Sequence, residues 1–202
     1  MKLFITAIGT DNGKTMASSI FCQALKADYW KPVQTGTVHL DADFIKEYAS
    51  YPIVIHPTTH HLKAPLSPHQ AAILEDKRIS LKDFQLPKTK NNLVVEGAGG
   101  VLVPINEKGD YVIDIAQKLN LEVVLVIRLY LGCINHAMLS IQELQRRNVP
   151  IKGLVFNGAD MYGAVSFITT ITDIPVLLHI NEEPDFSKEL VKYYAAFLGN
   201  LS

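Results

Sequence analysis

The sequence is poor in cysteine: Cys22 and Cys133 are the only two among 202 residues. Two cysteines so far apart do not make the disulfide framework of a small secreted domain or a cysteine-based metal site. We therefore expect both to be free thiols in a reducing cytoplasm. Cys22 stands in a helical pattern beside Ile20 and Phe21, so we expect it to pack in the core.

Excess charge and long apolar runs are also scarce. The formal net charge is −1, which argues against a nucleic-acid-binding protein that depends on a broad basic surface. No apolar run reaches membrane-spanning length. The chain opens directly on a strand pattern, without the basic, apolar and cleavage-site regions of a secretion signal. We expect a cytoplasmic protein with no nucleic-acid or membrane partner.

The sequence does have enough length and apolar content for one large core. Hydrophobic residues make up 48% of the chain and charged residues 19%, as in ordinary globular proteins. Apolar runs alternate with amphipathic segments over most of the length, and this alternation indicates repeated βα units. We predict a single α/β domain over residues 1–202, with a mainly parallel sheet and helices on both faces.

The same alternation gives the expected elements. The expected strands are 3–8, 28–33, 53–56, 92–96, 122–127, 151–157 and 176–179. The expected helices are 14–26, 43–50, 68–75, 111–119, 135–147, 162–172 and 186–198. The stretch 58–90 is rich in proline, histidine and charge, and we expect it to form an excursion from the sheet rather than a second domain.

The strongest motif is at the start of the chain. The strand pattern 3–8 is followed by a loop from Gly9 to Gly13, then by Lys14, Thr15 and a helical pattern. This is the layout of a phosphate-binding loop, as in P-loop NTPase-like folds. Glycine lets backbone N–H groups turn toward phosphate oxygens, and the helix N-terminus adds partial positive charge. Lys14 would reach the β- and γ-phosphates, and the Thr15 hydroxyl would bind Mg²⁺.

This loop departs from the usual pattern in one respect. The pattern G-x-x-x-x-G-K-[ST] wants its first glycine at position 8, where this chain has Ile8, and Gly9 comes one residue late. The alternative is an ordinary turn that happens to contain Gly-Lys-Thr. The preceding strand and the following helix favour the phosphate-binding loop.

A second cation follows the second expected strand, in the run KPVQTG at residues 31–36. Because parallel strands end at one edge of a sheet, Lys31 should lie near the phosphate-binding loop. The alternative is an exposed lysine before a turn proline. The sequence shows no obvious carboxylate partner, so a structural salt bridge is not the first explanation for Lys31. Farther along, Asp41 and Asp43 open a helical segment, where an aspartate could cap the helix or reach a metal-bound nucleotide.

A carboxylate ends another apolar strand pattern, in LVVEGAGG at residues 93–100. P-loop proteins place an acid linked to Mg²⁺ at such a strand end. No nearby cation in the sequence accounts for Glu96, so we favour a metal role over a plain strand exit. The glycines that follow allow close backbone approach to phosphate or substrate.

Two later strands end in polar turns. Asn157, before Gly158, could hydrogen-bond an adenine edge or simply begin a turn. The run LGCINH at residues 131–136 leads into an amphipathic helix, where Asn135 could be a helix cap. For His136 we favour a structural role.

These blocks, in this order and spacing, resemble the dethiobiotin synthetase family of biotin biosynthesis over most of the chain. The matching blocks are GKT at 13–15, KPVxTG at 31–36, Asp43, PxSPH at 65–69, VEGAGG at 95–100 and LGCINH at 131–136. Family members usually read TDTxVGKT at the loop, where residues 8–12 here keep only Thr10. The family's GxIP stretch is replaced by HINE at residues 179–182.

The resemblance implies an ATP- and Mg²⁺-dependent ring closure of 7,8-diaminononanoate with CO2 to dethiobiotin, ADP and phosphate. The intermediates would be a carbamate and a carbamic-phosphoric anhydride. Lys14 and Lys31 would be the catalytic cations, because an anionic carbamate must approach an anionic triphosphate.

The resemblance also implies roles for individual residues. Thr15, Asp43 and Glu96 would bind Mg²⁺. The implied ATP-binding residues are Thr10, Asp11, Asn12, Gly13, Lys14, Thr15, Met16, Asp43, Glu96, Gly97, Ala98, Gly99, Asn157 and Gly158. The implied substrate-binding residues are Thr35 and, from across a homodimer interface, Gly132, Cys133, Ile134 and Asn135.

Two other classes compete with this interpretation. A P-loop switch ATPase that positions cellular cargo would resemble the chain in fold, but its loop typically carries an extra lysine near its start. This chain has Ala7, Ile8 and Gly9 there. An ATP-dependent amide-forming ligase acting on a larger precursor usually needs a glutamine-hydrolysing domain, for which this chain has no room.

Overall fold

The computed structural model describes residues 1–38, 40–199 and 201 of the chain. Seven strands form one sheet in the order β4-β2-β6-β1-β7-β8-β9, and every neighbouring pair is parallel. In that order the strands are Ile55–His56, Asp28–Trp30, Leu93–Gly100, Lys2–Ala7, Glu122–Arg128, Ile151–Asn157 and Val176–Ile180. The predicted α/β class is confirmed.

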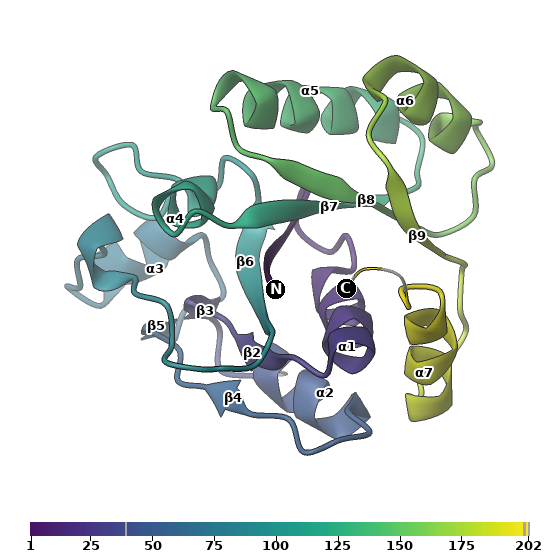
Figure 1. The fold of residues 1–202 in the computed structure, drawn as a ribbon. Helices are drawn as coiled ribbons and strands as arrows, with labels where there is room; N and C mark the ends of the chain where they lie inside the picture. Colours follow the sequence, from purple (N-terminus) through teal and green to yellow (C-terminus); the bar gives the residue numbers. More distant parts are fainter. Residues whose placement is uncertain (39, 200, 202) are drawn as a thin grey trace.

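Helices cover both faces of this sheet (Figure 1). On one face lie α1 (Lys14–Leu25), α2 (Asp41–Tyr48) and α7 (Lys188–Ala196). On the other lie α3 (Pro68–Leu74), α4 (Val112–Lys118), α5 (Cys133–Arg146) and α6 (Ala164–Thr172). Among the helices of the described residues, none has the length and apolar character needed to cross a membrane.

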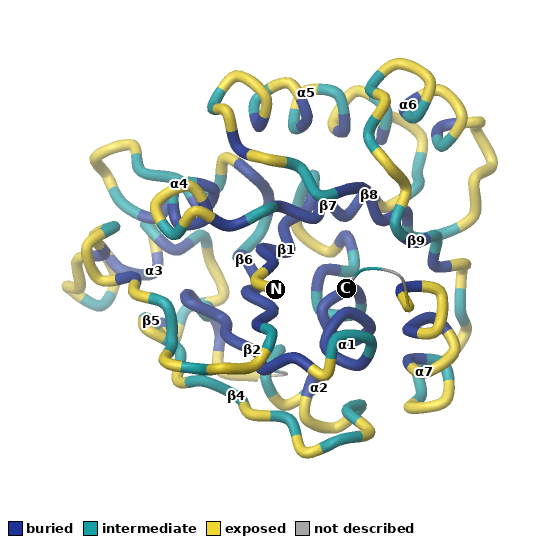
Figure 2. The backbone as a smooth tube through the Cα atoms, in the orientation of Figure 1, coloured by how far each residue is buried: buried dark blue, intermediate teal, exposed yellow. Residues whose placement is uncertain are grey.

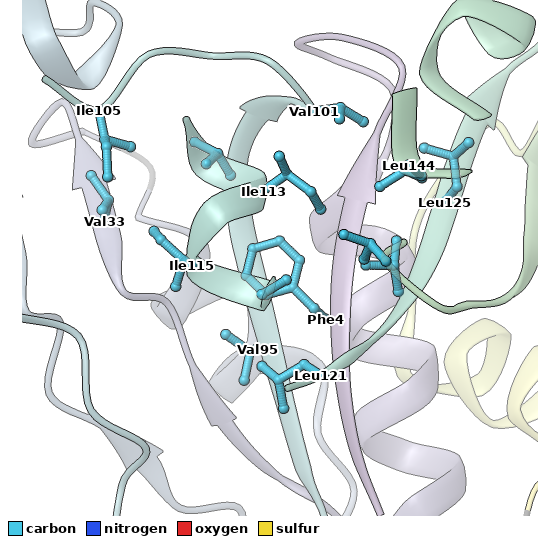
Figure 3. Close-up of a cluster of buried hydrophobic side chains, with 14 of the residues drawn as sticks. Phe4, Val33, Val95, Val101, Ile105, Ile113, Ile115, Leu121, Leu125 and Leu144 are labelled. Atoms are coloured by element: carbon cyan, nitrogen blue, oxygen red, sulfur yellow. The ribbon is translucent and has the colours of Figure 1, made fainter. Parts of the chain in front are cut away.

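The two faces of the sheet carry separate apolar cores, because successive side chains of a strand point to opposite faces. On β1, Leu3 and Ile5 pack in the core beneath α1, whereas Phe4 packs in the core beneath α4 and α5. The middle parts of the central strands β1, β6 and β7 are buried (Figure 2). Figure 3 shows Phe4 among Val95, Ile113 and Leu121. The strand that leads into the phosphate-binding loop is therefore held from both sides.

The expected strand 28–33 is wrong as a single element. It is divided into β2, Asp28–Trp30, and β3, Val33–Thr35. Pro32 stands between them and has no backbone N–H to donate to a ladder. After it, β3 leaves the main sheet and pairs in parallel with β5, His60–Leu62, in a separate two-stranded sheet.

The stretch 58–90 lies outside the main sheet, as expected, but it is not without structure. It contributes β5, α3 and a short 3-10 turn, η1, at Leu81–Asp83. Two other boundaries matter for the site. The strand β6 continues past Glu96 to Gly100, and α2 begins at Asp41, two residues before the expected start.

We predict that Phe4→Ala lowers the free energy of unfolding by about 3–5 kcal/mol, because the lost ring leaves a cavity in a fully buried core. Urea unfolding followed by circular dichroism measures the change. The matched control is Phe197→Ala, which should cost less than about 0.5 kcal/mol because Phe197 is 62% exposed. Equal losses for the two variants would contradict this account of the core.

Candidate active site

A polar cavity of about 440 Å³ lies at the carboxyl edge of the central strands, where parallel sheets bind ligands. Its lining comes from the loop after β1, the segment after β2, the start of α2 and the end of β6. The lining residues are Thr10, Asp11, Asn12, Gly13, Lys14, Thr15, Lys31, Gln34, Thr35, Val38, Asp41, Glu96, Ala98 and Gly99. Sequence blocks that are far apart in the chain therefore meet around one space.

The loop after β1 turns directly into α1 at Gly13. This residue has φ +91°, and a Cβ there would lie 2.4 Å from the side-chain nitrogen of Asn157. Only glycine combines this left-handed backbone with so close a neighbour. The Gly13-Lys14-Thr15 sequence thus has the helix-start geometry of a phosphate-binding loop.

The atypical residues before Gly13 are fixed by Asn12. Its side-chain nitrogen donates to the Thr10 carbonyl at 2.8 Å, and its side-chain oxygen accepts the Arg128 backbone N–H at 3.2 Å. The Asn157 side chain donates in turn to the Asn12 carbonyl at 3.1 Å. The loop therefore keeps a defined shape although it departs from the usual sequence pattern.

Gly9, the displaced first glycine of the loop, lies close to the backbone of Gly100 at the end of β6. A Cβ on Gly100 would lie only 3.2 Å from the Gly9 α-carbon. The backbone of the loop and the end of β6 therefore approach so closely that a side chain at Gly100 would force them apart.

The centre of the cavity holds a network of buried charges. The Lys31 ammonium lies 2.8 Å from Asp41 Oδ2 and 2.9 Å from Glu96 Oε1. Glu96 is fully buried, and its Oε1 also accepts the Thr15 hydroxyl at 2.9 Å. Thr15 lies within hydrogen-bonding distance of Asp41 as well. A phosphate-loop hydroxyl, two carboxylates and an ammonium are thus in direct contact.

This network corrects two expectations. Lys31 has two carboxylate partners, and Glu96 has a cation beside it. The partners Lys31 and Glu96 are 65 residues apart in the chain and meet only because their strands end at the same edge. The local sequence around either residue carries no sign of the pairing.

The network fixes the charge states of Lys31 and Asp41. Burial alone would lower the pKa of the Lys31 ammonium, but the charges of Glu96 and Asp41 outweigh it, and the pKa is raised. Burial alone would raise the pKa of the Asp41 carboxyl, but the charge and hydrogen bond of Lys31, with the Thr15 hydroxyl and the Lys14 charge, together outweigh it, and the pKa is lowered. Lys31 is therefore cationic and Asp41 anionic at neutral pH. Lys14 differs, because burial lowers the pKa of its ammonium.

The expectation for Asp43 is wrong, and Asp41 takes its place. Asp43 is exposed and does not line the cavity, whereas Asp41 faces Lys31 and Thr15. The reason is helix phase, since residues two apart on a helix differ by about 200° around its axis. The early start of α2 places both aspartates in its first turn, but only Asp41 points inward.

Four other expected nucleotide-binding residues do not line the cavity. Met16 packs partly buried against the core beneath α1. Gly97 faces Phe4, because a Cβ on it would lie 3.1 Å from that ring. Asn157 contacts the loop from behind, and the Gly158 N–H donates to the Ile180 carbonyl at 2.8 Å. An adenine-binding role for Asn157 and an ATP-binding role for Gly158 stay predictions.

The run 132–135 lies at the start of α5 and also does not line this cavity. Gly132 and Asn135 are exposed, and Ile134 is partly buried. The Cys133 side chain is buried, and its backbone N–H already donates to the Tyr130 carbonyl at 3.0 Å. A role of this run in substrate binding therefore depends on a second copy of the chain and stays a prediction.

A second cavity of about 390 Å³ adjoins the first. The two share Thr10, Thr35, Ala98 and Gly99. The remaining lining residues are Pro65, Leu66, Ser67, Pro68 and Val103. The less polar second space therefore lies beside the phosphate-binding loop, at the sequence block 65–68.

Sequence reasoning missed one further residue in contact with the network. The Tyr29 hydroxyl donates to Glu96 Oε2 at 2.9 Å. Tyr29 lies in the middle of β2 and precedes Lys31 by two positions, and a period of two puts both side chains on one face of an extended segment. That spacing was the available signal. Gln34 and Val38 also line the cavity, but the sequence contained no signal that would have identified them.

Comparison with known proteins identifies relatives over nearly the whole length of the chain. A family model described as an AAA domain matches residues 1–190. The ATP-dependent dethiobiotin synthetase BioD of Cytophaga hutchinsonii is 48% identical over 199 residues, which cover 98% of this chain and 96% of that protein. The protein of the same name from Christiangramia forsetii is 41% identical and covers 95% of this chain and 93% of its own.

Solved structures show the same fold at much lower identity. The septum site-determining protein MinD of Pyrococcus horikoshii, complexed with Mg-ADP, superposes with a TM-score of 0.61 at 16% identity, covering 100% of this chain and 90% of its own. A putative plasmid partition protein of Borrelia burgdorferi gives 0.59 at 14% identity, covering 98% and 95%. These two likenesses establish the P-loop NTPase-like fold alone, whereas the near-full-length relatives establish kinship. The chain belongs to the dethiobiotin synthetase family.

Proposed function

We propose that the chain catalyses the ATP- and Mg²⁺-dependent ring closure of 7,8-diaminononanoate with CO2 to dethiobiotin, ADP and phosphate. The observation that carries the proposal is the placement of Lys31. Its ammonium lies between Asp41 and Glu96, beside Thr15 of the phosphate-binding loop. A cation is thus held in a fixed position where a carbamate would meet a terminal phosphate, and its two carboxylate partners are available to Mg²⁺.

The phosphate-binding loop accounts for the nucleotide. Gly13, Lys14 and Thr15 line the polar cavity at the N-terminus of α1, and the backbone N–H groups at the start of a helix suit phosphate oxygens. Lys14 is 8% exposed and its ammonium is 3.4 Å from the Gly9 carbonyl. A partly desolvated cation in that place interacts strongly with an anion that enters the cavity.

The oxygen atoms of Thr15, Asp41 and Glu96 fit Mg²⁺, which prefers hard oxygen ligands. Within the described part of the chain, no group of three or more His, Cys, Asp and Glu side chains could hold a metal ion. Two carboxylates and one hydroxyl suit an ion that arrives with the nucleotide, because Mg²⁺ in such sites takes further ligands from phosphates and water. When bound, it neutralises charge on the β- and γ-phosphates.

The reaction begins when one amine nitrogen bonds to the CO2 carbon and loses a proton, which gives a carbamate. A carbamate oxygen attacks the γ-phosphorus, and the bond from that phosphorus to the bridging oxygen breaks, releasing ADP. The second amine then attacks the carbamate carbon. Loss of its proton and cleavage of the bond to the phosphate oxygen close the ring and release phosphate.

During these reaction steps, Lys31 and Lys14 offset the negative charge that accumulates as the carbamate approaches the triphosphate. Thr35 lines both cavities, which supports a contact between its side chain and the amine or its carbamate. The less polar second cavity has room for the hydrocarbon chain of the diamine.

A homodimer completes the proposal. The run 132–135 begins α5 outside the cavity of its own chain, so its backbone N–H groups, apart from that of Cys133, which already donates to Tyr130, would meet the substrate carboxylate only from a second copy. A cytoplasmic location stays a prediction.

The switch-ATPase alternative has less support. The MinD and partition-protein likenesses are at 16% and 14% identity, and the chain lacks the extra loop lysine noted above. The two functions differ in one observable property, which is whether ATP turnover depends on the diamine.

We predict that ADP and phosphate form only when 7,8-diaminononanoate, CO2, ATP and Mg²⁺ are all present, with dethiobiotin as the product. Coupled phosphate release and mass spectrometry measure the two sides of the reaction. Reactions without the diamine are the control. Equal ATP hydrolysis with and without the diamine, and no dethiobiotin, would favour the switch ATPase.

We predict that Lys31→Gln lowers kcat by about 10²–10³-fold, because it removes one preorganised donor at the site of charge development. ATP should still bind, since Lys14 and the loop N–H groups remain. The variant leaves Asp41 and Glu96 without their shared cation, so thermal unfolding must be measured beside kcat and ATP affinity. Near-normal kcat in a folded variant would remove Lys31 from the mechanism.

We predict that Asp41→Asn raises the Mg²⁺ concentration needed for half-maximal activity, whereas Asp43→Asn leaves it unchanged. The two aspartates differ by two positions on the same helix turn, and only Asp41 contacts Thr15 and Lys31. Activity titrated with Mg²⁺ at saturating ATP gives the comparison. A larger effect for Asp43→Asn would restore the original assignment from the sequence.

A further inference from the structure

The two oxygens of the Glu96 carboxylate have different surroundings. Oε1 faces the cavity and contacts the Thr15 hydroxyl and the Lys31 ammonium, each at 2.9 Å. Oε2 points away from them and accepts the Tyr29 hydroxyl at 2.9 Å. Glu96 and Tyr29 are both 0% exposed, so water does not substitute for this last contact.

The Tyr29 hydroxyl is aimed by a rigid framework. Tyr29 is the middle residue of β2 and is paired with Val94 of β6 on one side and Ile55 of β4 on the other. Its ring packs in the core beneath α1, in the same cluster as Cys22 and Ile45. Burial, and then the negative charge of Glu96, raise the pKa of this hydroxyl, so it remains a neutral donor.

We propose that Tyr29 is a positioning residue. Its hydrogen bond to Glu96 Oε2 would hold the carboxylate so that only Oε1 is directed toward the nucleotide-bound Mg²⁺. This inference rests on the proposed function. The terminal torsion of glutamate is broad and roughly two-fold, so a carboxylate without such a donor can turn either or both oxygens toward the cation. Mg²⁺ demands near-ideal octahedral geometry, which a single presented oxygen satisfies more readily.

A purely structural role is the competing explanation. Tyr29 could serve only to satisfy a buried carboxylate, in which case its hydroxyl would affect the free energy of unfolding and nothing else. The two explanations differ in whether loss of the hydroxyl changes metal-dependent nucleotide binding. Tyr29→Phe is the decisive variant, because it removes one oxygen atom and keeps the ring that fills the core.

The experiment is calorimetric binding of a non-hydrolysable ATP analogue across a series of Mg²⁺ concentrations and in EDTA. For Tyr29→Phe we expect the Mg²⁺ concentration at half-maximal enhancement of binding to rise about 10–100-fold, the usual effect of removing a partner of a metal ligand. Binding in EDTA should stay as in the wild type, because the phosphate-binding loop is untouched. Electron paramagnetic resonance of Mn²⁺ with the same analogue gives a second reading of the metal.

Tyr51→Phe is the matched control. The Tyr51 hydroxyl donates to the Ala27 carbonyl next to β2, so this variant also loses a tyrosine hydrogen bond in the same region but does not touch Glu96. It should leave Mg²⁺ dependence unchanged. In a Glu96→Gln background, adding Tyr29→Phe should produce no further rise, because the hydroxyl acts through that carboxylate.

Three results would overturn the inference. One is a Tyr29→Phe protein with lowered unfolding temperature but wild-type Mg²⁺ dependence, which leaves a structural role only. Another is an additive effect of Tyr29→Phe in the Glu96→Gln background. The third is a wild-type protein whose nucleotide binding ignores Mg²⁺, and this result alone would also overturn the proposed metal chemistry.

Discussion

The site depends on one constraint, which is that the charge of Glu96 lies fully buried at the end of a central strand. An isolated carboxylate in such a place is very unfavourable unless it is paired and hydrogen-bonded. Its partners come from α1, from β2 and from the segment directly after β2, and Lys31 extends the network to α2. Satisfying one carboxylate therefore joins the phosphate-binding loop to the half of the sheet that contributes Lys31.

Stability alone does not explain such a network. Buried ion pairs often contribute little compared with well-packed apolar residues of similar size, although removing one partner is costly. The surrounding core of β1, β6 and their helices is apolar and offers no chemical reason for a polar centre. The polar centre opens instead onto the cavity beside Lys14, which is consistent with its retention for chemistry on anions.

The sequence allowed the architecture to be predicted because the βα alternation is a local pattern. The bounds of β8 were predicted without error, and Lys14, Thr15, Lys31 and Glu96 were placed at one edge by strand polarity alone. The predictions that failed were those that depend on contacts between distant segments or on the exact start of a helix. The pairing of Lys31 with Glu96 joins distant segments, and the choice between Asp41 and Asp43 depends on where a helix starts. The hydrogen bonds of Asn12, which keep the atypical loop in shape, likewise reach to the end of β7.

The division of the chain at Pro32 places the two walls of the site on different frameworks. The phosphate-binding loop and Glu96 belong to the seven-stranded sheet, whereas Thr35 belongs to the small sheet of β3 and β5. Mutations in the small sheet, or in the adjoining block 65–68, can reshape the second cavity without displacing the phosphate-binding loop. Because the two parts are separate, substitutions in the small sheet or in block 65–68 can change which acceptor molecule binds. The phosphate-binding loop, which holds the phosphoryl donor, can stay the same.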